Sequence, residues 1–266
     1  MLKDRLLTAA LIALVLLPVL LLLPVAVALV LITVVVLLGA WEWSGLLPRA
    51  FAPRWLLPAL LAALLAMWWW LPLTADGIRM ILVAATLWWL IALLWIVLAP
   101  QFGRPVLTAL ACLLSLAPLW LAVLVLRGQD GPGAWRLLLA LLIVVAADTG
   151  AYFAGRAFGR VKLAPQVSPG KTWEGVIGGL LAAAAVAALG APWLGWSALQ
   201  ILPLALATAG MSVVGDLLES KMKRQAGVKD SGQLFPGHGG VLDRIDSLAA
   251  GLPVMALGFG SLGWLP

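Results

Sequence analysis

The chain alternates between long apolar stretches and short polar connections. Residues 6–41, for example, contain no charged side chain, and a membrane-crossing helix needs about 20 residues. The apolar stretches favour helices, because the strands of a membrane β-barrel alternate apolar and polar positions. The pattern therefore predicts an all-α polytopic integral membrane protein. About nine transmembrane helices are expected, at residues 5–23, 25–45, 54–73, 77–99, 105–126, 134–155, 173–191, 197–220 and 244–263.

Composition supports this assignment. Of the 266 residues, 64% are hydrophobic and 11% are charged, whereas soluble domains are about 25% charged. The net charge of +6 fits basic residues held at a cytoplasmic face and does not indicate nucleic-acid binding. Cys112, the only cysteine, can form neither an internal disulfide nor a cysteine metal site.

The distribution of Lys and Arg predicts the orientation. If the N-terminus lies in the cytoplasm, the segments expected on the cytoplasmic side hold most of the 17 basic residues. Only Arg79, Arg127 and Arg136 fall on the outer side. Basic residues of membrane proteins collect on the cytoplasmic side, so this bias favours a cytoplasmic N-terminus.

Charged residues are concentrated in the second half of the chain. Residues 148–246 contain nine basic and seven acidic side chains, out of 17 and 11 in the whole sequence. We expect a single integral domain, in which residues 1–133 form a scaffold of transmembrane helices and residues 134–266 form the catalytic half.

The first of three polar clusters is AADTGAYFAGRAFGR, at residues 146–160, and it contains Asp148. Asp148 falls near the end of an apolar span, and a charge at the centre of such a helix costs about 2.5–3.5 kcal/mol on insertion scales. It therefore needs either a function or a structural partner, which could be Arg156 or a residue on another helix.

The second cluster is SPGKTWEG, at residues 168–175. It contains Gly-Lys-Thr, but Pro165 stands where a P-loop has its first glycine, and no strand is expected before it. A Walker fold is therefore excluded. A helix N-terminus beside Lys171 would form an anion site. The alternative is a capped helix start with a lysine at the lipid headgroups.

The third cluster occupies residues 215–246. Asp216 and Glu219 share one helix face, and Asp243 and Asp246 repeat this three-residue spacing at the start of the last span. Carboxylates this close repel one another unless a cation lies among them, and oxygen ligands beside phosphate favour Mg²⁺. The connection between the two pairs is basic and rich in glycine.

This third cluster resembles the signature of the phosphatidate cytidylyltransferases, also called CDP-diacylglycerol synthases. The stretches DTGAYFAGR and SPGKTWEG are similar to two further blocks of that family, in the same order. The first half of the chain agrees only in size and in having several spans. The residues that match the signature are Ser220, Met222, Lys223, Arg224, Lys229, Asp230, Gly232, Phe235, Pro236, His238, Gly239, Gly240, Val241, Asp243, Arg244, Ile245 and Asp246.

The resemblance implies transfer of CMP from CTP to phosphatidate, giving CDP-diacylglycerol and pyrophosphate. It implies Mg²⁺ as cofactor, with room for a second cation, and an active site on the cytoplasmic face of a bacterial-type inner membrane. A homodimer is compatible with it. The residues implied as catalytic are Asp216, Asp243, Asp246 and Lys171, and the three aspartates are also the implied metal ligands. The residues implied in substrate binding are Ser168, Thr172, Lys223, Arg224, Lys229, His238, Gly239, Gly240 and Arg244. Additional candidates are Asp148, Glu174 and Glu219.

Other classes of protein fit the sequence less well. A transporter also places charges within a helical bundle, but it has little use for a glycine-rich loop with paired carboxylates at one face. A CTP-dependent polyprenol kinase uses a similar lipid and nucleotide, but it releases CDP. A CDP-alcohol phosphotransferase needs an Asp-Gly block and aspartates four residues apart, whereas here the spacing is three.

Overall fold

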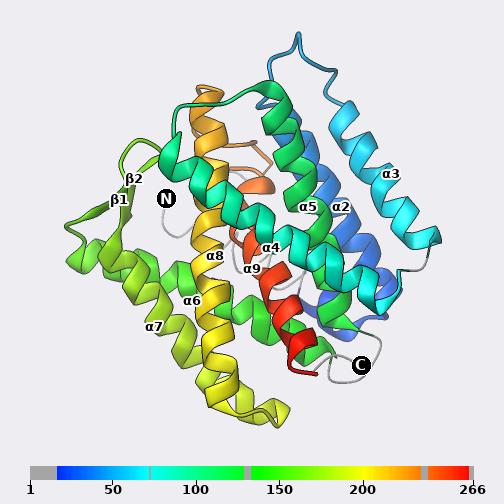
Figure 1. Ribbon diagram of the computed structural model, residues 1–266, viewed down its shortest axis with the longest axis vertical. Coiled ribbons are helices and arrows are strands. Elements are labelled where there is room, and N and C mark those ends of the chain that lie inside the picture. Colours follow the sequence, from blue (N-terminus) through cyan, green and yellow to red (C-terminus); the bar gives the residue numbers. More distant parts are fainter. Residues whose placement is uncertain (1–16, 72, 129–132, 235–238, 264–266) are drawn as a thin grey trace.

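The computed structural model describes residues 17–71, 73–128, 133–234 and 239–263. Within these ranges the chain forms a bundle of α-helices with one small β-hairpin at its edge (Figure 1). The helices are α2 (Val25–Ser44), α3 (Leu56–Trp70), α4 (Ala75–Leu98), α5 (Pro105–Arg127), α6 (Gly133–Phe158), α7 (Trp173–Gly190), α8 (Ala198–Gln225) and α9 (Leu242–Ser261), with a 3₁₀-helix η1 (Ala191–Leu194). The hairpin pairs β1 (Lys162–Ala164) with β2 (Ser168–Thr172) in antiparallel orientation.

Local sequence explains where several helices begin. Thr74 precedes α4, and its hydroxyl oxygen accepts a hydrogen bond from the Gly77 N–H (3.1 Å). Thr172 caps α7 in the same way through the Gly175 N–H (3.2 Å). Pro105 lies in the first turn of α5, where its missing N–H removes no helical hydrogen bond. The cap at Thr172 fixes α7 directly after β2.

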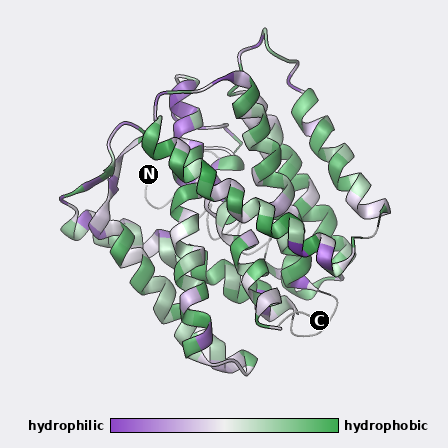
Figure 2. Cartoon of the chain, in the orientation of Figure 1, coloured by the Kyte–Doolittle hydropathy of each residue, from purple (hydrophilic) through white to green (hydrophobic). Residues whose placement is uncertain are grey.

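The polar part of the molecule lies at one end of the bundle. In the view of Figure 1, the C-terminal end of α8 lies at the top, the hairpin lies at the upper left, and the connection from α7 to α8 lies at the bottom. Figure 2 shows hydrophilic residues concentrated in the hairpin and in the upper turns of α8, whereas most of the remaining helical surface is hydrophobic. Charged residues from the second half of the chain come together at this polar end.

Helices α6 and α7 pack very closely through small residues. A Cβ on Gly178 would overlap the Cβ of Ala154, and one on Gly179 would come within 2.6 Å of the Ala147 carbonyl oxygen. Small side chains let helix backbones approach in a membrane protein, where packing drives association. The most extensive helix contacts in the described chain are those of α6 with α7 and of α8 with α9, and these four helices carry the carboxylates of the site.

The span predictions are confirmed at the level of fold class. Among the described residues, six helices are long and apolar enough to cross a membrane: α2, α4, α5, α6, α7 together with η1, and α8. The predicted span at 54–73 corresponds to α3, which has only 15 residues. The predicted span at 244–263 corresponds to α9, whose first turns carry Asp243, Arg244 and Asp246 and are therefore less apolar. Most of the predicted span at 5–23 lies outside the described residues.

One expectation about the Gly-Lys-Thr run is wrong. From the sequence we expect no strand before this run, but residues 168–172 are themselves strand β2, paired with β1 before them. The two strands are too short to show an alternating pattern, and a tight turn joins them through the Val167 N–H and the Ala164 carbonyl (3.1 Å). The Walker fold stays excluded, because Gly170 and Lys171 lie within a strand and not in a phosphate-wrapping loop.

Candidate active site

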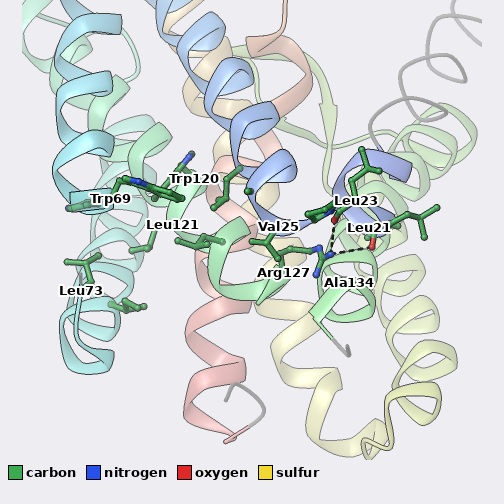
Figure 3. Close-up of a pocket in the computed structure, with 16 residues that line it drawn as sticks. Leu21, Leu23, Val25, Trp69, Leu73, Trp120, Leu121, Arg127 and Ala134 are labelled. Carbon is green, nitrogen blue, oxygen red and sulfur yellow. Dashed lines mark hydrogen bonds between the residues drawn. The ribbon is translucent and has the colours of Figure 1, made fainter. Parts of the chain in front are cut away.

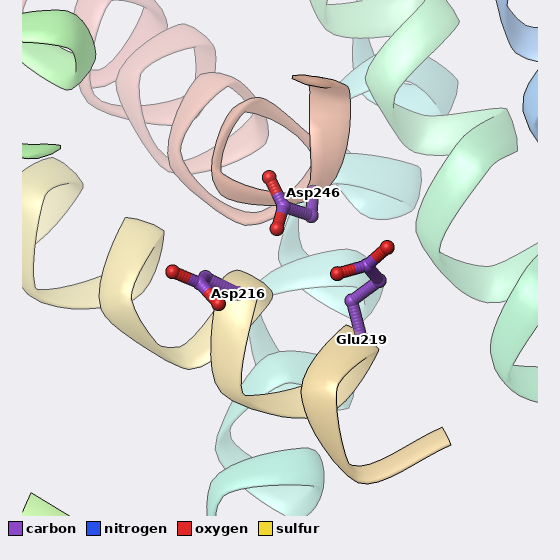
Figure 4. Close-up of side chains that lie close together, drawn as sticks. All are labelled: Asp216, Glu219 and Asp246. Carbon is purple, nitrogen blue, oxygen red and sulfur yellow. The ribbon is translucent and has the colours of Figure 1, made fainter. Parts of the chain in front are cut away.

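Three carboxylates meet where α8 faces α9. Asp216 and Glu219 project from α8, and Asp246 projects toward them from α9 (Figure 4). One oxygen from each of the three lies within 4.8 Å of the others. The spacing of three residues along α8 places Asp216 and Glu219 on one face, as expected from the sequence. We call Asp216, Glu219 and Asp246 the acidic cluster.

Two lysines approach the acidic cluster from different sides. Lys171 reaches from β2, and its Nζ lies 2.6 Å from Asp216 Oδ2. Lys223 lies one turn beyond Glu219 on α8, and its Nζ is 2.5 Å from Glu219 Oε2. Glu219 is only 2% exposed, and its Oε1 has no hydrogen-bond partner among the described residues. A buried oxygen without a partner is costly, so the cluster fits a bound cation.

The donor atoms of the cluster match a hard cation. All three ligands are carboxylates, and oxygen ligands are those that Mg²⁺ and similar ions prefer. The predicted metal ligands Asp216 and Asp246 both belong to the cluster. Glu219, which the sequence gives only as an additional candidate, is the third member.

Asp243 lies beside the cluster and is linked to it through Lys223. Its Oδ1 accepts a hydrogen bond from Lys223 Nζ (2.5 Å), and its Oδ2 accepts from the Ser231 hydroxyl (2.7 Å) and the Gly240 N–H (2.7 Å). Asp243 lies just before the last predicted membrane span, residues 244–263. Burial raises the pKa of Asp243, but the hydrogen bonds from Lys223, Gly240 and Ser231 outweigh this effect and lower the pKa to about 2. Asp243 therefore joins Lys223 of α8 to the loop that precedes α9.

A cavity of about 470 Å³ opens beside the cluster. Its lining comes from α6, β2, α7, α8 and α9, and it includes Asp216, Asp243 and Asp246 together with Lys171 and Arg244. This wall combines acidic, basic and apolar groups, and ligand pockets commonly have an apolar lining with a few polar groups that orient the ligand.

Two more predicted residues line the same cavity. Asp148 of α6 accepts a hydrogen bond from the Ser247 hydroxyl of α9 (3.2 Å), so its described partner lies on another helix and is not Arg156. Thr172 is buried and uses its oxygen to cap α7. Asp148 and Thr172 therefore both lie at the wall of the cavity, within reach of a bound ligand.

Other predicted residues lie at the edge of the site or away from it. Ser168 begins β2, and Glu174 accepts a hydrogen bond from the Val161 N–H (3.2 Å), which holds the hairpin against α7. Arg224 and Lys229 are exposed near the C-terminal end of α8, where Arg224 donates to the Val228 carbonyl (3.2 Å).

The glycine-rich loop is described in part. Gly239 has a φ of 79°, a left-handed conformation that favours glycine, and Gly240 donates its N–H to Asp243. The predicted substrate-binding residue His238 lies outside the described residues.

Tyr152 and Arg156 also line the cavity, although neither is among the predicted site residues. They lie one turn apart on α6, and Arg156 Nη1 donates a hydrogen bond to the Tyr152 hydroxyl (3.2 Å). The sequence could have indicated both residues, because they belong to the DTGAYFAGR stretch, which resembles a block of the family.

A larger cavity, of about 1040 Å³, lies at the opposite end of the bundle between α2, α3 and α5 (Figure 3). Its lining is mainly apolar, with Trp69 and Trp120 on one side. Arg127 donates hydrogen bonds to the carbonyl oxygens of Leu20 (2.7 Å) and Leu23 (3.2 Å). The Arg127 guanidinium group is therefore engaged by backbone carbonyl oxygens. The smaller cavity beside the acidic cluster is the better candidate for an active site.

Comparison with known proteins gives matches over nearly the whole chain. The profile of the cytidylyltransferase family matches residues 3–261. A phosphatidate cytidylyltransferase from Haemophilus influenzae is 40% identical over 283 aligned positions, which cover 95% of this chain and 96% of that protein. One from Pseudomonas aeruginosa is 44% identical over 280 positions, with 99% of each chain covered. One from Brucella suis is 47% identical over 146 positions, which cover 53% of each chain.

Proposed function

The chain belongs to the cytidylyltransferase family, and we propose that it transfers the cytidylyl group of CTP to phosphatidate, giving CDP-diacylglycerol and pyrophosphate. The family membership expected from the sequence is confirmed by these matches. The observation that carries the proposal is the acidic cluster with its two lysines, placed at the polar end of a membrane bundle. A lipid acceptor and a water-soluble donor can meet at such a place.

We assign Asp216, Glu219 and Asp246 to the binding of Mg²⁺. Bound Mg²⁺ supplies positive charge to phosphate oxygens and helps to orient them. Asp243 is already engaged by Lys223, Ser231 and Gly240, so we assign it to ordering the loop beside the metal ligands. This assignment changes the role that the family signature implies for Asp243.

The basic residues of the cavity would bind and orient the phosphates. Lys171 and Arg244 both line it, and Lys171 is held in place by Asp216. Phosphoryl chemistry depends mainly on positioning and on neutralising charge in line. Lys223 would act near the metal, because its ammonium group lies between Glu219 and Asp243.

We propose a single displacement. A phosphate oxygen of phosphatidate forms a bond to the α-phosphorus of CTP, and the bond from that phosphorus to the oxygen bridging to the β-phosphate breaks. The electron pair leaves with pyrophosphate. The attacking phosphate is largely ionised near neutral pH, since monoester second pKa values are about 6, so a general base is dispensable. His238 would donate a hydrogen bond to the nucleotide or the loop.

We further propose the arrangement in the membrane. Nine spans with a cytoplasmic N-terminus would place the acidic cluster at the cytoplasmic face of the inner membrane, where CTP is available. Residues 1–133 would act mainly as scaffold and residues 134–266 as the catalytic half. The preference of basic residues for the cytoplasmic side supports this orientation.

The test is to follow each phosphate of CTP. Purified protein is incubated with phosphatidate, Mg²⁺ and CTP labelled at either the α- or the γ-phosphate. We expect the α-label in CDP-diacylglycerol and the γ-label in pyrophosphate. A γ-label in a lipid product would indicate a kinase and overturn the proposal. With a chiral α-thiophosphate, inversion at phosphorus is expected, whereas retention or a cytidylylated His238 would contradict a single displacement.

A further inference from the structure

Glu42, near the C-terminal end of α2, reaches the start of α9. The side chain is buried, and its Oε2 accepts hydrogen bonds from the Leu242 N–H (2.8 Å) and from the Ser231 hydroxyl (3.2 Å). These contacts join residues about 200 positions apart in the sequence. They connect the scaffold half of the chain to the helix that carries Asp246.

The Glu42 carboxyl group fills the space beside two glycines of the loop. A Cβ on Gly232 would overlap Glu42 Oε1, and a Cβ on Gly240 would overlap Glu42 Oε2. Neither glycine is among those with positive φ, so backbone conformation does not require them. Both positions instead need glycine because a side chain would displace Glu42.

The same contacts lead directly to the candidate active site. The Ser231 hydroxyl lies within hydrogen-bond distance of both Glu42 and Asp243. The Ser231 N–H also donates a hydrogen bond to Asp243 (3.1 Å). The Leu242 N–H belongs to the first turn of α9, where backbone N–H groups have no partner within the helix. A carboxyl group at this end also interacts favourably with the helix dipole. Glu42 thus caps α9 from a different helix.

We propose that Glu42 is a positioning residue for the metal ligands. By capping α9 and bracing the loop, it sets the distance of Asp246 on α9 from Asp216 and Glu219 on α8. Glu42 acts through the Leu242 N–H and Ser231 and is not part of the acidic cluster. This inference rests on the proposed function for its effect on turnover, but its structural part can be measured independently.

A double-mutant cycle tests the steric link. Gly240→Ala in the wild-type background should lower turnover by roughly 10–100-fold, because a misplacement near 1 Å can cost about 100-fold. In a Glu42→Ala background the added methyl group has room, so the same change should lower turnover by less than about 3-fold further. Gly210→Ala is the matched control, because its Cβ would meet no atom within 4 Å. Equal losses in both backgrounds would overturn the link.

The second test compares Glu42→Gln with Glu42→Ala. Glutamine keeps an oxygen that can accept from Leu242 and Ser231, so Glu42→Gln should retain much more activity than Glu42→Ala. Glu42→Ala should also speed amide hydrogen exchange in residues 239–246 and reduce the thermal stabilisation given by Mg²⁺ alone. Asp76→Ala, at the exposed start of α4, is the control and should change neither.

The outcomes separate the two proposals. Wild-type exchange and wild-type Mg²⁺ stabilisation in Glu42→Ala would overturn the positioning role. Equal damage from glutamine and alanine would also overturn it, because keeping an acceptor for the Leu242 N–H and the Ser231 hydroxyl would then make no difference. If wild-type protein bound Mg²⁺ but made no CDP-diacylglycerol, the proposed function would fail, while the exchange measurement would still decide the role of Glu42.

Discussion

Asp243 and Asp246 stand three residues apart on one helix, yet their surroundings differ. Asp246 faces Asp216 and Glu219, whereas Asp243 accepts hydrogen bonds from Lys223, Ser231 and Gly240. The difference arises because Ser231 and Gly240, in the described parts of the connection before α9, both donate hydrogen bonds to the earlier aspartate. This difference supports the proposal that Asp246 binds a cation and that Asp243 orders the loop.

Replacing Asp243 by asparagine should separate these two roles. The amide keeps the shape but loses the charge that faces Lys223, so the loop should loosen and turnover should fall by about 10–100-fold, the scale expected for lost positioning. The Mg²⁺ concentration that gives half-maximal activity should stay near the wild-type value. Turnover at varied Mg²⁺ and hydrogen exchange over residues 229–234 measure both effects. A large rise in the required Mg²⁺ would instead make Asp243 a ligand.

At the scale of elements, α6 and α7 form the wall that carries β2 and Lys171. Their glycines leave no space for side chains: Cβ atoms on Gly150 and Gly178 would meet Ala182 (2.6 Å) and overlap Ala154, respectively. Since Lys171 reaches Asp216 from this wall, the separation of the two helices affects the site directly.

Gly178→Ala should push α7 away from α6. Overpacking of this kind destabilises proteins by about 1–3 kcal/mol, so the thermal midpoint in detergent should fall, and turnover should fall with it as Lys171 moves. Gly210→Ala, which adds a methyl group in open space on α8, should leave both quantities near wild type. If the two variants behave alike, close packing of α6 and α7 is not what Gly178 provides.

Predictability from sequence also differs between elements. Long apolar helices such as α5 were predictable, because their length and composition are set by the membrane alone. The hairpin was not predicted, because β1 has three residues and its pairing with β2 depends on tertiary context. The i, i+3 spacing predicted that Asp216 and Glu219 share a face. It could not predict which of Asp243 and Asp246 would face them, nor that Glu42 would cap α9, because these facts depend on how distant helices pack.

At the scale of the whole molecule, the bundle has one polar end and one apolar end. The hairpin and the C-terminal turns of α8, the helix that carries Asp216 and Glu219, are hydrophilic (Figure 2), whereas the large cavity beside Arg127 at the C-terminal end of α5 has a mainly apolar lining (Figure 3). The proposed orientation places the polar end in the cytoplasm, where most basic residues are expected.

Cysteine labelling tests this orientation. A membrane-impermeant maleimide added to intact cells should label Ser197→Cys, before α8, and should leave Gln166→Cys, in the hairpin turn, unlabelled until the cells are opened. Both native side chains are exposed. The wild-type protein is the control, because its Cys112 is fully buried and should not react. Labelling of Gln166→Cys from outside would reverse the orientation.

The most direct measurement is the Mg²⁺ dependence of CDP-diacylglycerol formation by Glu219→Gln. Glutamine matches the shape of Glu219 but removes the charge that completes the acidic cluster with Asp216 and Asp246. Loss of even an outer-shell partner typically costs about 10–100-fold in metal affinity, so we expect the half-maximal Mg²⁺ concentration to rise by at least about 10-fold. Reduced thermal stabilisation by Mg²⁺ should accompany this rise. An unchanged Mg²⁺ requirement, with wild-type turnover at low Mg²⁺, would contradict the assignment of the acidic cluster as the metal site of cytidylyl transfer.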